Sequence, residues 1–125
     1  MIYGVGVDIV DIKRFTKVLN KMEERFLSKI FTGKEIDECK TKRRWISSLA
    51  MKFSAKEAFS KAIRTGMRMG VRWKDIEIYH IKGGAPQIRL YGKAQDICNE
   101  KGIKRVHLSL SDHGDYAISM VVLEV

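Results

Sequence analysis

The sequence predicts an α+β fold, in which a mainly antiparallel sheet carries helices on one face. Two pairs of strand-like segments are each joined by a short glycine-containing turn, and short turns join antiparallel strands. A third stretch, residues 43–64, has the apolar spacing of a long helix. With 125 residues, 45% of them hydrophobic, and one proline, the chain can form one ordered domain over residues 1–125.

The elements follow in chain order. Residues 2–10 are β-rich and lack a polar helical face, so they predict the first strand. A basic segment follows with Ile12, Phe15, Val18 and Leu19 at helical spacing, and Thr32 before Glu35 is a capping box for a short helix to about Cys39. The remaining predicted elements are a helix from about 43–45 to Arg64, a hairpin of 75–81 and 86–91 around Gly83-Gly84, a helix at 94–101 stopped by Gly102, and a hairpin of 106–111 and 115–125 around Asp112–Gly114.

The charge of the chain limits its partners. The sequence has 24 Lys and Arg against 15 Asp and Glu, a net charge of +9. Such an excess favours a polyanion: nucleic acid, an anionic membrane surface, a phosphorylated small molecule or an acidic protein. No apolar run is long enough to span a bilayer, the N-terminus lacks the basic region of a signal peptide, and Cys39 and Cys98 are far apart. We therefore expect a cytoplasmic protein with free thiols and no membrane partner.

Asp8 is a carboxylate in an otherwise apolar strand. A period of two places it on the same face as Gly4 and Gly6, which have no side chains. Glycine within a strand often marks close approach by a ligand or another backbone. Two interpretations remain at this point: Asp8 caps the following helix, or it takes part in a site.

Glu57 and Lys61 lie one turn apart on the predicted long helix, beside a seam of small and apolar residues. A pair at this spacing is commonly an ordinary surface ion pair. The small residues at 54, 55 and 58 would also let the helix approach the sheet closely. Asp8 and Glu57 could then share Mg²⁺, which typically binds one or two carboxylates together with water and phosphate oxygens, and a nearby lysine suits phosphate.

The histidines do not form a zinc pattern, because the sequence has no HExxH motif or Cys/His cluster. His107, Ser109 and Ser111 share one face of a predicted strand and form a polar stripe. This stripe serves either cross-strand hydrogen bonding and interface packing or ligand binding.

Three stretches together resemble the bacterial holo-[acyl-carrier-protein] synthase family of small 4′-phosphopantetheinyl transferases. They are GVGVDIVDIKRF at the start, FSAKEAFSK at 53–61, and HLSLSDHGDYA from His107. Motif order and spacing are intact from Ile2 almost to the C-terminus. The resemblance implies transfer of 4′-phosphopantetheine from coenzyme A to a serine of apo acyl carrier protein, with release of adenosine 3′,5′-bisphosphate.

The resemblance also implies roles for particular residues. Asp8 and Glu57 would hold Mg²⁺, and Lys61 would contact or neutralise the phosphates and assist proton transfer. The resemblance assigns no role to Lys56, which we expect to supply either phosphate-binding charge for the cofactor or surface charge. The family is a homotrimer with sites between subunits, in which a neighbour would supply the Gly84–Pro86 turn and the stripe of His107, Ser109 and Ser111. Carrier-protein docking would fall to the basic residues of the first helix: Arg14, Lys17, Lys21 and Arg25.

Two points stay open in the sequence. Many family members have a second histidine where this chain has Asp112, with His113 one residue later, so a second histidine has no assigned role. The general base is a metal-polarised or bridging water, Glu57, or a carboxylate of the partner.

The alternative function is a basic nucleic-acid-binding α+β module, for which the sequence has charge but no aromatic RNA-binding or zinc-finger signature. We expect no nucleic-acid partner.

Overall fold

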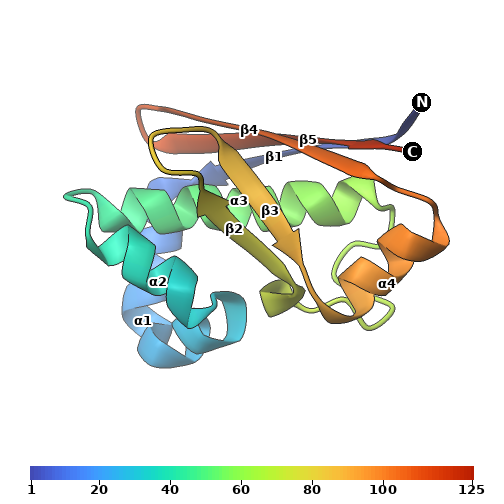
Figure 1. Ribbon diagram of the computed structural model, residues 1–125. Coiled ribbons are helices and arrows are strands. Elements are labelled where there is room, and N and C mark those ends of the chain that lie inside the picture. The colour runs from blue at the N-terminus through green and yellow to red at the C-terminus, as the bar shows by residue number, and fades with distance from the viewer.

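The computed structural model describes residues 1–125, apart from the side chain of Glu23. Figure 1 shows the arrangement of its elements. In chain order these are β1 (Ile2–Asp11), α1 (Ile12–Ile30), α2 (Gly33–Lys40), α3 (Trp45–Ala62), the short 3₁₀ helix η1 (Trp73–Asp75), β2 (Ile76–His80), β3 (Pro86–Leu90), α4 (Gly92–Glu100), β4 (Arg105–His113) and β5 (Tyr116–Glu124).

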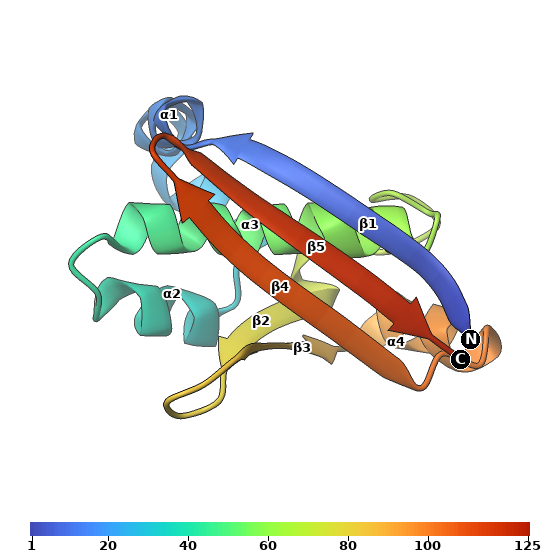
Figure 2. The ribbon, with the colours of Figure 1, turned by 90° about the horizontal axis from the view of Figure 1, so that it is seen from above.

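The strands form two antiparallel sheets. The larger has the order β1-β5-β4, and the smaller is the hairpin of β2 and β3. Helix α3 crosses beneath β1 and β5, while the β2–β3 hairpin lies beyond β4 (Figure 2). The predicted α+β fold with antiparallel strands is confirmed, although its strands divide between two sheets.

Helix α3 is central because its apolar residues face both the large sheet and the small one. The predicted seam is confirmed: Ala55, Ala58, Phe59, Ala62 and Ile63 are all buried. They belong to one core cluster with residues of β2, β5 and α4. Burial on several sides explains why α3 carries small and large apolar residues around most of its circumference.

The helix ends follow local capping chemistry. The carboxylate of Asp11 accepts hydrogen bonds from the backbone N–H groups of Lys13 (3.0 Å) and Arg14 (3.3 Å) and so caps α1. The cap is therefore Asp11, and the capping interpretation of Asp8 is wrong. Thr32 and Glu35 form the predicted capping box of α2.

The second hairpin differs from its prediction at the turn. Strand β4 continues through Asp112 and His113, which pair with Ala117 and Tyr116. The turn itself is Gly114 with Asp115, and Gly114 has a positive φ of 58°. The polar side chains of Asp112 and His113 suggested a turn. Both residues can instead pair within β4, because their side chains are exposed at the end of an edge strand.

The outer face of the large sheet is apolar and exposed. Figure 2 looks onto this face, and no helix of the described residues covers it there. The exposed apolar side chains include Val5, Val7, Ile9, Ile118 and Met120. Contiguous apolar surface of this kind is typical of an interaction site.

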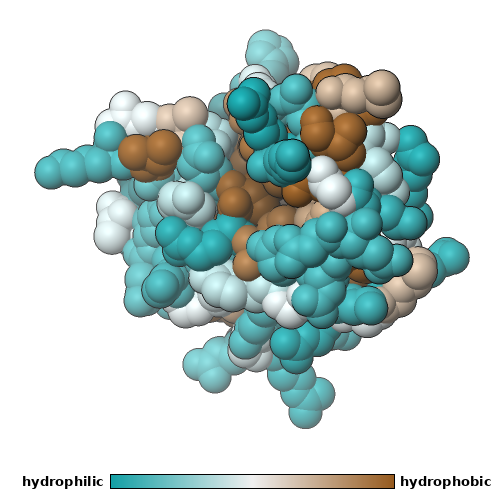
Figure 3. Space-filling model, turned by 45° about the vertical axis from the view of Figure 1, so that its right-hand side comes forward, coloured by the Kyte–Doolittle hydropathy of each residue, from teal (hydrophilic) through white to brown (hydrophobic). Residues whose placement is uncertain are grey.

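Much of the remaining surface is polar. In Figure 3, hydrophilic side chains surround an apolar hollow on the face that it shows. Among the described residues, no helix is both long enough and apolar enough to traverse a bilayer.

Candidate functional site

Strand β1 lies directly against the backbone of α3. A Cβ added to Gly4 would meet the carbonyl oxygen of Ala62 at 2.1 Å, and one added to Gly6 would meet that of Ala58 at 1.8 Å. Neither position can hold a side chain without moving an element. The glycines and alanines therefore bring the end of β1 next to the middle of α3.

This approach places Asp8 beside α3. The Ser54 hydroxyl donates to the backbone carbonyl of Asp8 at 3.1 Å and also bonds the hydroxyl of Ser119 at 2.7 Å. Ser119 is the partner of Asp8 in the β1–β5 ladder. The backbone at Asp8 is thus fixed from both sides, while its carboxylate stays 14% exposed.

Lys61 pairs with Asp8 across the two elements. Its ammonium donates to Asp8 Oδ1 at 3.1 Å and to the carbonyl of Val7 at 3.0 Å. The sequence had offered an ordinary Glu57–Lys61 helix pair as one interpretation. The structure instead turns Lys61 toward the strand, and the lysine side chain remains 52% exposed.

Glu57 lies next to this pair and is half-buried. Burial raises the pKa of its carboxyl, the negative charge of Asp8 raises it further, and the Lys61 ammonium offsets part of the shift. The negative charges of Asp8 and Glu57 therefore repel each other.

The pair fits a hard divalent cation. Both groups supply oxygen, and a bound cation would relieve the repulsion by Asp8 that, after burial, raises the pKa of Glu57. The described residues contain no cluster of three or more His, Cys, Asp or Glu that could hold a metal. A cation here would take its other ligands from water or substrate, as Mg²⁺ commonly does. Asp8, Glu57 and Lys61 are thus brought together as the sequence analysis expected.

Lys56 lies elsewhere, on a buried face of α3. Its ammonium donates to Glu35 Oε1 at 2.8 Å and to the carbonyls of Trp73 (2.9 Å) and Ile76 (2.6 Å). The side chains of Lys56 and Glu35 are both 0% exposed. These contacts use all three N–H donors of an ammonium, so this placement argues against the expected cofactor contact of Lys56.

The polar stripe lies on the opposite edge strand. His107, Ser109 and Ser111 are exposed on one side of β4, as predicted. The His107 ring Nε2 lies 2.6 Å from Glu124 Oε1. Strand β5 separates β4 from β1, so a single chain does not bring this stripe to Asp8.

The hairpin turn that carries Gly84 joins β2 to β3 beyond β4 (Figure 2), and Pro86, predicted in the turn, is the first residue of β3 and pairs with His80. The turn closes through the N–H of Gly84, which donates to the carbonyl of Ile81 at 2.8 Å. The turn therefore lies on the β4 side of the large sheet, away from β1.

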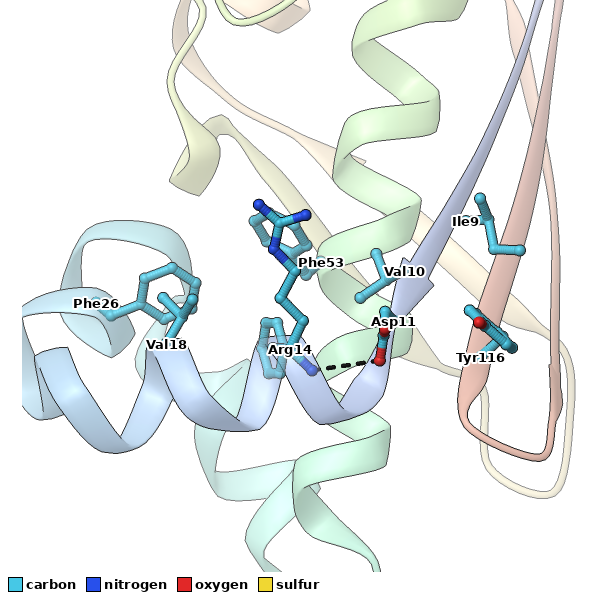
Figure 4. Close-up of a pocket in the computed structure, with 9 residues that line it drawn as sticks. Ile9, Val10, Asp11, Arg14, Val18, Phe26, Phe53 and Tyr116 are labelled. Atoms are coloured by element: carbon cyan, nitrogen blue, oxygen red, sulfur yellow. Dashed lines mark hydrogen bonds between the residues drawn. The ribbon is translucent and has the colours of Figure 1, made fainter.

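The basic residues of α1 follow the end of β1 that carries Asp8. Arg14, Lys17, Lys21 and Arg25 are all exposed. Beside them an apolar cavity of about 390 Å³ lies between α1, α3 and the ends of β1 and β5. In Figure 4 the Arg14 side chain extends beside Phe53, with Val18 and Phe26 lining the cavity along α1.

This cavity was missed by the sequence analysis. Its aromatic residues come from separate elements, and each alone has the pattern of a core residue. Phe15, Phe26 and Phe53 form edge and tilted ring contacts, with centroids 5.6–6.1 Å apart. The cavity can be recognised only in the tertiary structure, where the fold brings the three rings together at one end of β1.

Comparison with known proteins gives consistent matches over the full chain. The sequence profile of the 4′-phosphopantetheinyl transferase superfamily matches residues 4–121. The holo-[acyl-carrier-protein] synthase of Geotalea daltonii is 44% identical over 124 residues, covering 99% of each chain. That of Halothermothrix orenii is 43% identical over 124 residues, covering 99% of this chain and 98% of the relative.

Solved structures agree with these sequence matches. The holo-[acyl-carrier-protein] synthase of Neisseria meningitidis has a TM-score of 0.91 and 40% identity, covering 100% of both chains. The Helicobacter pylori enzyme, solved in complex with coenzyme A, has a TM-score of 0.85 and 32% identity, covering 96% of this chain and 99% of that one. With its glycine-cleared β1, its paired carboxylates and these full-length matches, the chain belongs to the 4′-phosphopantetheinyl transferase superfamily.

Proposed function

We propose that Asp8 and Glu57 hold Mg²⁺ and that Lys61 binds phosphate at the active site of this transferase. The chain transfers the 4′-phosphopantetheine group from coenzyme A to a serine of acyl carrier protein and releases adenosine 3′,5′-bisphosphate. The observation that carries the site assignment is the contact between two elements distant in sequence. Two carboxylates and an exposed lysine meet where glycine clears the way for α3.

The side chains have distinct parts in this proposal. Mg²⁺, when bound, would neutralise charge on the pyrophosphate oxygens, which is the main requirement of phosphoryl-type transfer. Lys61 leaves its contact with Asp8 and neutralises a phosphate oxygen, for which its half-exposed ammonium is free to turn. Ser54 holds the backbone of Asp8 in place during this exchange.

The complete site is shared between subunits of a homotrimer in this proposal. The exposed apolar face of the large sheet is suited to contact with other copies of the chain. Asp8 and the His107 stripe lie on opposite edges of the sheet, so a neighbour's stripe and Gly84–Pro86 turn can complete the nucleotide site where one chain cannot.

The carrier protein docks on α1. Arg14 and Lys21 attract its acidic side chains, and the adjacent apolar cavity accepts an apolar side chain from the same surface. This combination of cations around an apolar cavity suits an acidic amphipathic helix. The attacking serine then approaches from the α1 end of β1.

The alternative, a nucleic-acid-binding module, would give the carboxylate pair of Asp8 and Glu57 no role. Binding of nucleic acid that falls steeply with salt would favour that alternative. We also propose a cytoplasmic location, which is consistent with the free, buried thiols of Cys39 and Cys98.

The test is a mass-spectrometric assay on apo acyl carrier protein with coenzyme A, with and without Mg²⁺. Wild-type protein is expected to add phosphopantetheine in the presence of Mg²⁺, while Asp8→Ala and Glu57→Ala lose this activity and keep the fold. Asp37→Ala is the matched control, because Asp37 is an exposed carboxylate on α2. Normal turnover in the Asp8 or Glu57 variant would refute the metal assignment.

A further inference from the structure

Ser119 is a buried polar residue on the inward face of the large sheet. Its neighbours in β5, Ile118 and Met120, are exposed on the outer apolar face, because successive residues of a strand face opposite sides. The residues that share its inward face, Ala117 and Val121, are apolar and fully buried. The Ser119 hydroxyl must therefore find its hydrogen bond inside the protein.

The Ser119 hydroxyl bonds the hydroxyl of Ser54 on α3. The two oxygens are 2.7 Å apart, and both residues are buried. The Ser54 hydroxyl also donates to the backbone carbonyl of Asp8 at 3.1 Å. Because a hydroxyl carries one proton, Ser54 cannot donate to Ser119 as well. Ser119 is therefore the donor of the pair, and the two bonds form a chain that runs from Ser119 through Ser54 to Asp8.

This chain of hydrogen bonds ends on a candidate metal ligand. Aspartate has only two side-chain torsions, so the position of the Asp8 backbone largely sets where its carboxylate oxygens can lie. The Lys61 ammonium also restrains the carboxylate, but it is half-exposed and leaves Asp8 in the proposed mechanism. The two hydroxyls are buried, so they can hold Asp8 after Lys61 has left.

We infer that Ser119 is a positioning residue, which acts through Ser54 to hold Asp8 where its carboxylate binds Mg²⁺. The inference rests on the proposed metal site and adds β5 to the elements that shape it. Removing a group that hydrogen-bonds a metal ligand typically costs about 10–100-fold in metal affinity. In a chain of hydrogen bonds each bond polarises the next, so donation by Ser119 strengthens the bond from Ser54 to Asp8.

The test is a titration of the protein with Mg²⁺ in the absence of substrate, followed by NMR of the backbone amides around Asp8. Ser54→Ala loses both bonds, so its Kd for Mg²⁺ should rise about tenfold. Ser119→Ala keeps the bond from Ser54 to Asp8, so its Kd should rise less, about threefold. Ser48→Ala removes a half-buried hydroxyl from the same helix and is the matched control, with an unchanged Kd.

A double variant shows whether Ser119 acts through Ser54. If it does, Ser54→Ala with Ser119→Ala should have the Kd of Ser54→Ala alone, rather than the product of the two single effects. The double variant should also be more stable to urea than Ser54→Ala. The reason is that Ser54→Ala leaves the Ser119 hydroxyl buried without an acceptor, and the second substitution removes that hydroxyl.

The outcomes separate positioning from packing alone. Wild-type Mg²⁺ affinity in Ser119→Ala, with or without a loss of stability, would overturn the inference. Multiplicative effects in the double variant, or an equal loss of affinity in Ser48→Ala, would overturn it too. Failure of the proposed metal site has a different signature, which is an Asp8→Ala variant that responds to Mg²⁺ as the wild type does.

Discussion

Gly6 and Ala58 touch through their backbones: a Cβ on Gly6 would lie 1.8 Å from the carbonyl oxygen of Ala58. This contact sets the spacing between β1, which carries Asp8, and α3, which carries Glu57. The distance between the two carboxylates therefore depends on the absence of a side chain two residues before Asp8.

Gly6→Ala should consequently impair both stability and activity. The new methyl group meets backbone atoms that cannot turn away, so β1 must move off α3, at a cost of about 3 kcal/mol or more in the free energy of unfolding. Urea unfolding measures the stability, and kcat at a temperature where the variant is folded measures the activity.

The matched control is Gly33→Ala in the first turn of α2. No atom lies within 4 Å of the added Cβ there, and alanine is the better helix former, so stability should stay equal or rise. A Gly6 variant as stable and active as the Gly33 variant would contradict the close packing of β1 on α3.

The pKa of Glu57 should respond to the charge of Asp8 and, if the proposed metal site is correct, to Mg²⁺. Burial, and then the charge of Asp8, raises its pKa above the ordinary value of 4.5. Asp8→Asn removes the like charge and should lower the pKa, whereas Asp37→Asn should leave it unchanged. Because a cation favours the ionised carboxylate, Mg²⁺ should also lower it in the wild type. Carbon-detected NMR of the side chain measures these shifts, and indifference to Mg²⁺ would contradict the metal assignment.

The raised pKa of Glu57 also predicts how the stability of the protein changes with pH. Folded Glu57 keeps its proton to a higher pH than unfolded Glu57 does. The metal-free protein should therefore lose stability as pH rises from about 4.5 through the raised pKa, and Asp8→Asn should weaken this loss. Thermal unfolding across this range, with and without Mg²⁺, measures the effect.

Local patterns in the sequence predicted most of the fold and the residues that meet at the centre of the candidate site. Alternation along β1 placed Asp8 on the face cleared by Gly4 and Gly6, and the helical period placed Glu57 and Lys61 one turn apart. Both patterns are properties of neighbouring residues. The ion pair between Lys61 and Asp8 does not follow from such local patterns, because it depends on the side-chain rotamer with which Lys61 reaches from α3 to β1.

Lys56 shows where such reasoning fails. Its place between Ala55 and Glu57 gives no sign that it is buried, and lysine is almost never fully buried unless it is paired. The partner, Glu35, lies on another helix and was assigned only a capping role in the sequence. Long-range ion pairs of this kind, like the assembly of aromatic rings beside α1, require the tertiary structure.

Lys56→Met should therefore reduce mainly the stability of the protein, and Lys61→Met should reduce mainly its activity. Loss of Lys56 leaves the buried carboxylate of Glu35 without its cation and should lower the free energy of unfolding by about 3–5 kcal/mol, while the KM for coenzyme A of the folded protein stays unchanged. Loss of the half-exposed Lys61 should change stability by less than about 1 kcal/mol but reduce transfer.

Urea unfolding and steady-state kinetics on both variants give the comparison. Adding Glu35→Gln to Lys56→Met should recover part of the lost stability, because it removes the unpaired charge. A stable Lys56 variant with a raised KM for coenzyme A would restore Lys56 as a cofactor residue.

Charge reversal on α1 should weaken carrier-protein binding selectively. Arg14→Glu with Lys21→Glu replaces attraction by repulsion at an exposed surface, so the KM for the carrier protein should rise about tenfold or more, while that for coenzyme A changes little. The wild-type KM for the carrier should also rise with salt. Steady-state kinetics with each substrate varied in turn measures both values, and a larger effect on coenzyme A would refute docking on α1.

Sharing of the site between subunits can be tested by mixing two inactive variants. Asp8→Ala removes a group on β1, and His107→Ala removes one on β4, on the opposite edge of the same sheet. If each site combines β1 of one subunit with β4 of its neighbour, some mixed trimers contain a site with neither substitution. Unfolding the two variants together and refolding them should then restore part of the wild-type transfer rate, whereas each refolded alone stays inactive.

Val7→Lys, placed on the exposed apolar face, should lower the oligomeric state in sedimentation and reduce activity with it. Full activity in a Val7→Lys monomer, or no recovery on mixing, would mean that each chain carries a complete site.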